Sequence, residues 1–359
     1  MKLLRTHSLP FEKIVKCRAN LTPSFSKMEW NHAIQLWPQY KVITDIPEYN
    51  PIEPYIPKTF AAEVFRAIEK AEVDTSQSGA ADNEARVAVL IRVVRKNCPI
   101  PSPMPSKCPA LFESTVNRST SFLTARKILV EISSLFSGAV SNDAEGYIAG
   151  TASSQGRIES IYTVLGACVN VVLEVKAGGI RNRNFAQMMA ELESCDMLNV
   201  SRQLNLNTLQ GVLSSQTEWH FWAYDRRGFT VSEAIAPYHR DEKQEIMNRL
   251  KIVARLFGQF LKGYCPALHA FIRRSEGKGF QEQQEHSPSY NEWKKASSLA
   301  EAAQAKAFSA KGEQDFAVVR SLLNQSYDAL PHDCKRPLRF PTQSNIIDEC
   351  IEELQCRKT

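Results

Sequence analysis

Apolar side chains recur every three to four positions in several stretches of the chain, and this spacing predicts amphipathic helices. The clearest stretch is His239–Tyr264, where large aliphatic and aromatic residues follow one face and lysine and arginine fill other positions. An alanine-rich stretch at 292–311 also favours a helix strongly. Further helices are predicted at 26–35, 60–71, 84–96, 184–197, 315–323 and 345–354, with another inside 112–136.

β-branched residues cluster in the middle of the chain. Val169–Val175 is such a run, and it predicts a buried strand. Residues 157–164 alternate in part between apolar and polar positions and predict a strand before it. We expect these two strands to form an antiparallel hairpin whose turn lies near 165–168. The Gly-, Ser- and Ala-rich stretch 142–154 predicts a flexible loop or a loosely paired strand.

A second hairpin is expected downstream, formed by the stretches 205–215 and 218–224 with a short turn at 215–217. Bulky side chains occupy both alternating sets of positions in the second of these strands, which predicts that both of its faces are covered. We interpret these aromatic residues, and His220 among them, as core packing, with stacking on unpaired bases as the functional alternative. Together the strands and helices indicate a mixed α/β fold with additional helical segments at both ends.

The distribution of prolines and polar residues divides the chain into four parts. Residues 98–110 are proline-rich and predict an extended linker. We assign 1–97 to an N-terminal arm and helical segment, 111–264 to a central core, and 265–359 to a helical C-terminal lobe. The arm is expected to pack against the main body, with partner binding as the alternative. The polar stretch at the start of the lobe, 265–290, predicts a mobile loop.

The composition is that of an ordinary globular chain, with 43% hydrophobic and 23% charged residues among 359. The 44 basic and 39 acidic residues give a net charge of +5, which permits a nucleic-acid partner without requiring one. Nine cysteines without Cys-X-X-Cys pairs favour reduced thiols over a zinc site or a disulfide framework. We expect no signal peptide, no transmembrane segment and no membrane partner, and hence an intracellular protein, nuclear or cytoplasmic. The oligomeric state does not follow from the sequence.

Candidate chemistry gathers on the first predicted hairpin. Glu174 and Lys176 lie two positions apart at the end of the buried strand, so they share one face, while Val175 faces the other way. Burying an acid and an amine there costs free energy unless they are paired or bound to something. The hairpin would bring Glu159 towards them. Two carboxylates can hold a divalent cation and a lysine can place a water, which is the logic of metal-assisted phosphodiester hydrolysis.

Gly-Arg-Ile-Glu159, fifteen positions before Glu174-Val-Lys176, resembles the core of the PD-(D/E)XK nuclease superfamily. In that superfamily an acid starts one strand, Glu-X-Lys ends the next, and a helix follows that often carries a glutamine facing the site, which Gln187 matches. The resemblance implies a restriction-endonuclease-like mixed sheet flanked by helices. It also implies that Glu159, Glu174 and the Val175 carbonyl bind Mg²⁺ or Mn²⁺, that Lys176 orients the attacking water, and that Gln187 supports the site.

The chain departs from the superfamily pattern in two ways. Glu159 stands where the family usually has Asp, and no proline precedes it. Members often carry a further acid on an earlier helix, and the sequence does not choose among Glu84, Glu113 and Glu131. The Crinkler and retrotransposon-hot-spot groups of effectors join such domains to NTPase modules, but this chain shows no NTPase motif.

Three hypotheses follow from these patterns. The first is a metal-dependent endonuclease acting on nucleic acid, DNA rather than RNA, in which Arg181 and Arg183 contact phosphates at the mouth of the site; a plain charged turn is the alternative for these arginines. The second is a nuclease-like fold that has lost catalysis and binds nucleic acid or protein. The third is a helical scaffold in which Glu-X-Lys is a coincidental surface salt bridge.

Overall fold

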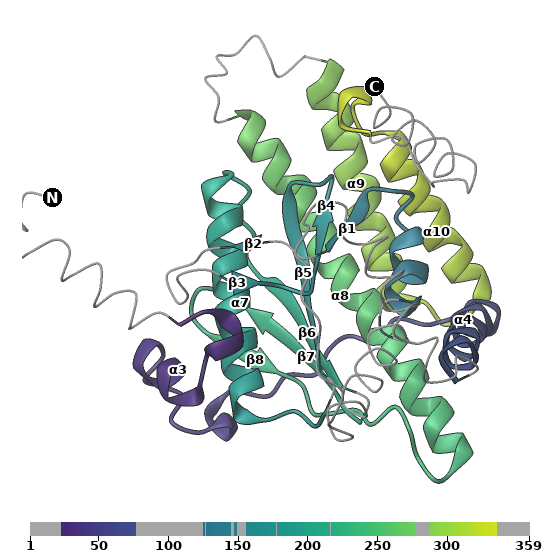
Figure 1. The fold of residues 1–359 in the computed structure, drawn as a ribbon. Helices are drawn as coiled ribbons and strands as arrows, with labels where there is room; N and C mark the ends of the chain where they lie inside the picture. The colour runs from purple at the N-terminus through teal and green to yellow at the C-terminus, as the bar shows by residue number, and fades with distance from the viewer. Residues whose placement is uncertain are drawn as a thin grey trace, which may run out of the picture.

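The computed structural model describes residues 23–76, 125, 127–144, 147–148, 156–176, 178–215, 217–276 and 288–335. These residues form a mixed α/β fold (Figure 1). Its strands are β1 (Val140–Ala144), β2 (Tyr147–Ile148), β3 (Gly156–Arg157), β4 (Ser160–Val164), β5 (Cys168–Lys176), β6 (Leu209–Ser215), β7 (Trp219–Tyr224) and β8 (Phe229–Val231). Its helices are α3 (Trp30–Leu36), α4 (Lys58–Ser76), α7 (Asn182–Ser201), α8 (Glu242–Glu276), α9 (Pro288–Ser309) and α10 (Glu313–Asp328), with 3-10 turns at Phe25–Lys27, Ile43–Asp45 and His332–Cys334. Residues 127–134 are also helical.

A six-stranded mixed sheet organises the fold, with strand order β1-β4-β5-β6-β7-β8. The central pair, β5 and β6, is parallel, and α7 provides the crossover between them. The other neighbouring pairs are antiparallel. β2 and β3 form a separate two-stranded ribbon. The central strands β5 and β6 are buried along nearly their whole length, which explains why β5 reads as a continuous apolar run rather than an alternating one.

Helices cover both faces of the sheet (Figure 1). On one face, Phe185 of α7 packs edge-on against Trp222 of β7, with ring centroids 5.4 Å apart. On the other face, Phe260 of α8 packs against Tyr162 of β4, with centroids 5.2 Å apart. α9 and α10 pack outside α8, where the Tyr264 hydroxyl lies 3.3 Å from the Ser326 hydroxyl. On the α8 side of β7, the Arg255 guanidinium lies 5.8 Å from the Phe221 ring centroid. β7 is therefore covered on both sides, as its double set of bulky side chains predicts.

The predicted β4–β5 hairpin is confirmed. Its turn spans 165–167, where Leu165 and Gly166 adopt positive φ angles of 52° and 66°. Leu165 is strained there because its Cβ crowds the backbone, whereas Gly166 adopts this conformation freely. The pairing register shifts between Tyr162 and Thr163, which inserts an extra residue into β5.

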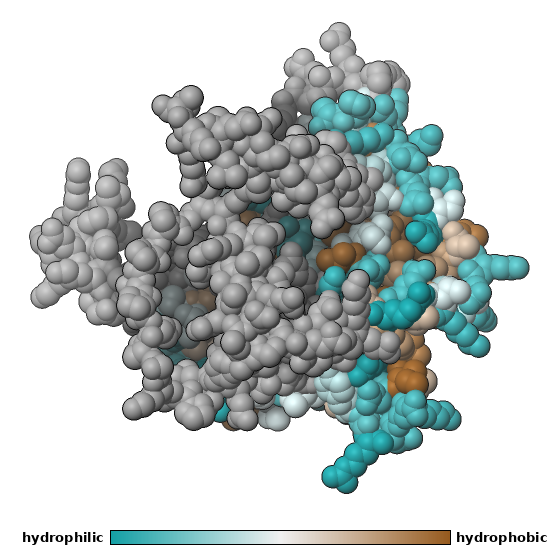
Figure 2. Space-filling view, turned by 45° about the vertical axis from the view of Figure 1, so that its right-hand side comes forward, coloured by the Kyte–Doolittle hydropathy of each residue, from teal (hydrophilic) through white to brown (hydrophobic). Residues whose placement is uncertain are grey.

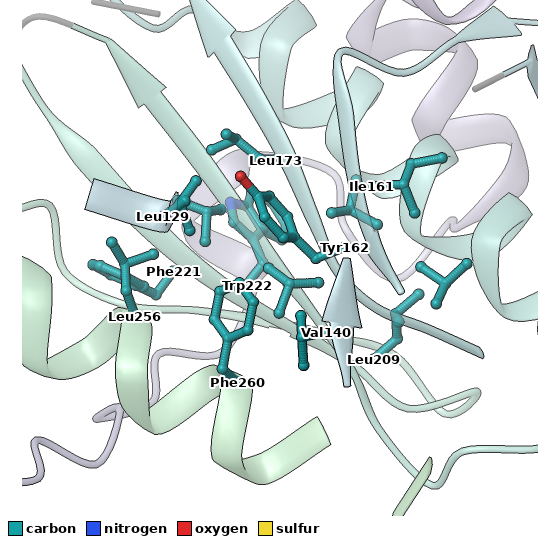
Figure 3. Close-up of a cluster of buried hydrophobic side chains, with 14 of the residues drawn as sticks. Leu129, Val140, Ile161, Tyr162, Leu173, Leu209, Phe221, Trp222, Leu256 and Phe260 are labelled. Carbon is teal, nitrogen blue, oxygen red and sulfur yellow. The ribbon is translucent and has the colours of Figure 1, made fainter. Parts of the chain in front are cut away.

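One layer of the core lies between the sheet and α8 (Figure 3). Leu129 from the helical segment 127–134, Tyr162 from β4 and Phe260 from α8 all bury their side chains in it. The three come from distant parts of the chain, so this layer forms only when the helices dock on the sheet.

Asn199 fixes the irregular part of β5 to α7. Its Oδ1 accepts the Val169 N–H at 2.7 Å, and its Nδ2 donates to the Val169 carbonyl at 2.9 Å. Both residues are buried. The side chain thus satisfies strand backbone groups at the register shift, where the ladder is disturbed.

Asn199→Ala is expected to lower the free energy of unfolding by about 2–4 kcal/mol, because it leaves the buried Val169 N–H without its acceptor and the carbonyl without this donor. Urea denaturation measures the change. Asn182→Ala, at an exposed position in the first turn of the same helix, is the control and should change the free energy by about 0.5 kcal/mol or less. Equal losses in the two variants would show that Asn199 has no special role.

The N-terminal arm packs against the body over the part that the structure describes, residues 23–57. Phe25 is buried beside Gly156, so close that a Cβ on this glycine would meet the Phe25 ring at 2.0 Å. Trp37 packs edge-on against Phe229 of β8, with centroids 5.0 Å apart. Farther along, the Tyr49 N–H donates to the Val231 carbonyl at 3.1 Å, which covers the β8 edge of the sheet. The packing interpretation of the arm therefore holds for these residues.

Several element boundaries differ from the sequence expectation. α8 runs to Glu276 through Pro266 and α9 begins at Pro288, so the loop expected at 265–290 is wrong for residues 265–276 and 288–290. The helix continues because Ala267 and Leu268 keep its apolar face buried, and this outweighs the backbone hydrogen bond lost at Pro266. Within 142–154, the alternative of a paired strand is confirmed for residues 142–144, because β1 pairs with β4. The expected helices 84–96 and 345–354 and the linker 98–110 lie outside the described residues.

The described surface mixes hydrophilic and hydrophobic residues on the face shown in Figure 2. Over the whole described surface, the large apolar side chains that are well exposed are spread over several helices and loops: Leu36, Val42, Ile52, Val130, Met197, Val200, Tyr238, Ile246, Met247 and Val318. Among the helices that the structure describes, none combines the length and apolarity needed to cross a membrane.

Candidate active site at the end of β5

Glu174 and Lys176 project from the last residues of β5 towards α7. Both side chains form hydrogen bonds with Gln187 of α7. Val175 lies between them in the sequence, faces the other side of the strand and is also buried. This is the alternation expected of a strand. Glu174 itself is buried, so a carboxylate has been placed in the interior at the point where the strand leaves the sheet.

Glu159 meets β5 from the neighbouring strand. It lies in a bend between β3 and β4, not inside one continuous strand from 157 to 164 as the alternation suggested. The next residue, Ser160, pairs with Leu173, so Glu159 stands beside the end of β5. Its Oε2 accepts the Val175 N–H at 3.0 Å. The hairpin thus brings position 159 to positions 174–176, as its predicted turn requires.

Gln187 connects the charged residues into one network. The Lys176 ammonium donates to Glu174 Oε1 and, at 2.8 Å, to Gln187 Oε1. The Gln187 Nε2 group donates to Glu174 Oε1, also at 2.8 Å. α7 begins at Asn182, two residues before the start predicted at 184, so Gln187 lies in its second turn. We refer to Glu159, Glu174, Lys176, Gln187 and Glu191 as the cluster. The Lys176 side chain is 19% exposed and that of Glu174 is 3% exposed, so the cluster is open to solvent at Lys176.

Glu191 is the member of the cluster that the sequence did not reveal. It lies one turn after Gln187, is fully buried, and accepts a second hydrogen bond from Gln187 Nε2 at 2.7 Å. Its Oε2 has no hydrogen-bond partner among the described residues. The spacing of four positions from Gln187 on a helix was the available signal, because such residues share one face.

Burial raises the pKa of the Glu191 carboxyl well above its ordinary value, and the nearby Glu174 and Glu159 carboxylates raise it further. Lys176 and the hydrogen bond from Gln187 act in the opposite direction and lower it. Burial dominates because removing a carboxylate from water disfavours its charged form.

Glu191→Gln is expected to stabilise the metal-free protein at pH 7–8 and to change little near pH 4. Below the unfolded-state pKa of about 4.3 the carboxyl is neutral in both states. As the pH rises above that value the unfolded state ionises first, so the native protein loses stability until its own raised pKa is reached. Thermal unfolding across this pH range measures the difference. Glu193→Gln on the same helix is the control, and an equal effect there would contradict the assignment.

Arg181 and Arg183 stand at the entrance to α7, and both side chains are exposed. Neither forms a side-chain hydrogen bond or ion pair within the part of the chain that the structure describes. Arg181 is the N-cap residue of α7. Asn184 lies three positions later, and its Oδ1 accepts the Arg181 N–H at 2.8 Å. The arginines flank the cluster but do not join it.

A second polar pair borders the cluster on the same face of the sheet. Glu174 pairs with Leu213, which pairs with His220, so the three lie in one row across β5, β6 and β7. His220 lies 3.2 Å from Glu218, and its ring packs on Phe185 with centroids 5.1 Å apart. Its contact with Phe185 agrees with the packing role expected for it.

Glu218 also connects two loops at this end of the sheet. Its Oε1 accepts the Ile180 N–H at 2.9 Å, which ties the β5–α7 connection to the β6–β7 turn.

Glu131, one of three candidates for a further acid, lies on the helical segment 127–134, where its backbone carbonyl accepts a hydrogen bond from the Ser134 hydroxyl. Glu84 and Glu113 lie outside the described residues.

The carboxylates suit a hard divalent cation. Glu174 is buried and Glu159 half-buried, and both contact or adjoin the Val175 backbone. Within the described ranges no group of three or more His, Cys, Asp and Glu side chains is placed to hold a metal. Mg²⁺ is bound in many sites by one or two carboxylates and retained waters, so two carboxylates with a backbone carbonyl remain a chemically suitable set.

Comparisons with protein-family models, with curated proteins and with solved structures gave no match for this chain.

Proposed function

We propose that the protein is a divalent-metal-dependent nuclease with a restriction-endonuclease-like core, which hydrolyses phosphodiester bonds of nucleic acid, DNA in preference to RNA. The observation that carries the proposal is the convergence of Glu159, Glu174 and Lys176 at the end of one hairpin. The order of elements also supports it, because a helix carrying Gln187 follows the Glu-X-Lys strand and leads into a parallel neighbour.

Each residue has a role in the proposed reaction. Glu159, Glu174 and the Val175 carbonyl would hold Mg²⁺ or Mn²⁺, and the bound cation would supply positive charge to the phosphate. The Lys176 ammonium has three N–H donors and uses two of them for hydrogen bonds to Glu174 and Gln187. The third N–H positions the attacking water. The water oxygen bonds to phosphorus and loses a proton to solvent, one P–O ester bond breaks, and the departing oxygen receives a proton from solvent.

The exposed arginines at the start of α7 fit the approach of a nucleic-acid backbone. Arg181 and Arg183 are located at the same end of α7 as Gln187 and can offer bidentate hydrogen bonds to phosphate oxygens. Arg181→Ala/Arg183→Ala is expected to weaken DNA binding about 3- to 30-fold at low salt and to flatten its salt dependence. Fluorescence anisotropy with a labelled duplex measures this. Unchanged affinity and salt slope would exclude the pair from the interface.

A binding module that has lost catalysis is the second candidate. Glu159 favours it, because this residue replaces the usual Asp and its Oε2 is already engaged by the Val175 N–H. Plasmid, single-stranded DNA and RNA substrates, incubated with Mg²⁺, Mn²⁺ or EDTA, separate the two candidates. Metal-dependent cleavage supports the nuclease. Binding without cleavage supports the module, and absence of both supports an unrelated scaffold.

A further inference from the structure

We propose that Glu191 is a positioning residue, which holds the Gln187 amide in the orientation that presents its oxygen to Lys176. This inference rests on the proposed nuclease function for its kinetic consequence. Its structural content concerns three side chains of α7 and β5 and can be tested without catalysis.

The orientation of the Gln187 amide follows from the chemistry of its neighbours. Glu174 Oε1 and Glu191 Oε1 lie 2.8 and 2.7 Å from Nε2, and both are acceptors. Lys176 Nζ lies 2.8 Å from Oε1 and can only donate. A flipped amide would place oxygen against two acceptors and NH₂ against an ammonium. The Glu191 carbonyl oxygen accepts whether or not the carboxyl is protonated, so its raised pKa does not remove this contact.

Glu191 becomes decisive when Glu174 has another task. In the metal-free protein Glu174 Oε1 accepts from both Gln187 and Lys176. A Glu174 carboxylate that ligates a cation has less capacity to accept these bonds. Glu191 then remains as the acceptor that keeps Nε2 turned inwards, and the oxygen of Gln187 stays directed at the Lys176 amine.

The burial of Glu191 is consistent with such a role. A fully buried carboxylate whose Oε2 has no hydrogen-bond partner among the described residues destabilises the fold relative to an apolar side chain. A purely structural role would predict that removing it harms stability. Our proposal predicts the reverse, with activity lost while stability is kept or gained.

Two variants of similar size separate the contact from the charge. Glu191→Gln keeps an oxygen that can accept from Gln187, and its kcat should stay within about threefold of the wild-type value. Glu191→Leu removes the acceptor, and its kcat should fall about 10- to 100-fold with KM unchanged. Its melting temperature should equal or exceed that of the wild type. In a Gln187→Leu background, Glu191→Leu should have no further effect on kcat, since it acts through Gln187.

The metal-free protein gives an independent readout. A double-mutant cycle of Gln187→Leu and Lys176→Met, followed by urea denaturation in EDTA, measures the coupling between these two side chains. We expect Glu191→Leu to reduce that coupling by at least half and Glu191→Gln to preserve it. Unchanged coupling in Glu191→Leu overturns the proposal, as does a kcat equal to that of the wild type. If the wild-type protein cleaves no substrate, the nuclease function fails, while the coupling still decides the role of Glu191.

Discussion

Lys176→Ala is expected to lower the rate of Mg²⁺-dependent phosphodiester cleavage by about 10³-fold, with little change in DNA binding. The ammonium group is the cationic donor at the open side of the cluster, and it is held there by Glu174 and Gln187. Without it, the attacking water and the charge that develops on the phosphate lose their positive partner. Single-turnover cleavage of an end-labelled duplex measures the chemical step.

Two controls separate chemistry from folding in this experiment. Lys251→Ala removes an exposed lysine from α8 and should leave the cleavage rate within about twofold of the wild type. Lys176→Ala leaves Glu174 buried without its cation, which destabilises the protein. The double variant Glu174→Gln/Lys176→Met removes both charges, so it should fold and remain inactive. A Lys176→Ala protein that is folded and cleaves at the wild-type rate would refute the role given to this residue.

Glu174→Ala is expected to abolish detectable cleavage and to weaken Mn²⁺ binding about 10- to 100-fold. Glu174 is the more buried of the two proposed carboxylate ligands. Without it, Glu159 is the one remaining carboxylate of the pair that can bind the cation. Isothermal titration of the metal-free protein with Mn²⁺ measures the affinity directly. Glu233→Ala, an exposed acid near β8, is the control and should bind Mn²⁺ as the wild type does. Equal affinity in all three proteins would place the cation elsewhere.

The hairpin and its charged residues could be predicted because their signals are local. A β-branched run, a turn near residue 165 and an acid near the start of the predicted strand 157–164 suffice to bring Glu159 beside Val175. Gln187 followed from the same short stretch, although only through a family pattern. The predicted helices at 239–264 and 292–311 are also found, because their apolar periodicity is strong.

The remaining features depend on contacts between distant segments. Asn199 stands in an ordinary helical sequence, and only the register shift in β5 gives it a buried backbone partner thirty positions earlier. β8 is three residues long and was not foreseen; its pairing depends on β7 and on the chain near Tyr49. In the sequence, Glu191 resembles a solvated helix residue, and its burial becomes evident only from the packing of α7 against the sheet. The end of α8 was misjudged because a proline normally ends a helix, whereas tertiary packing sustains this one.

The most direct measurement is the anomalous diffraction of Mn²⁺ in crystals of the protein soaked with that ion. We expect a single strong peak between the carboxylates of Glu159 and Glu174, within about 2.0–2.4 Å of an oxygen from each. The peak should be absent from crystals of Glu174→Ala. Absence of anomalous density at this position, in crystals where the two carboxylates are ordered and Mn²⁺ is saturating, would contradict the proposed metal-dependent centre.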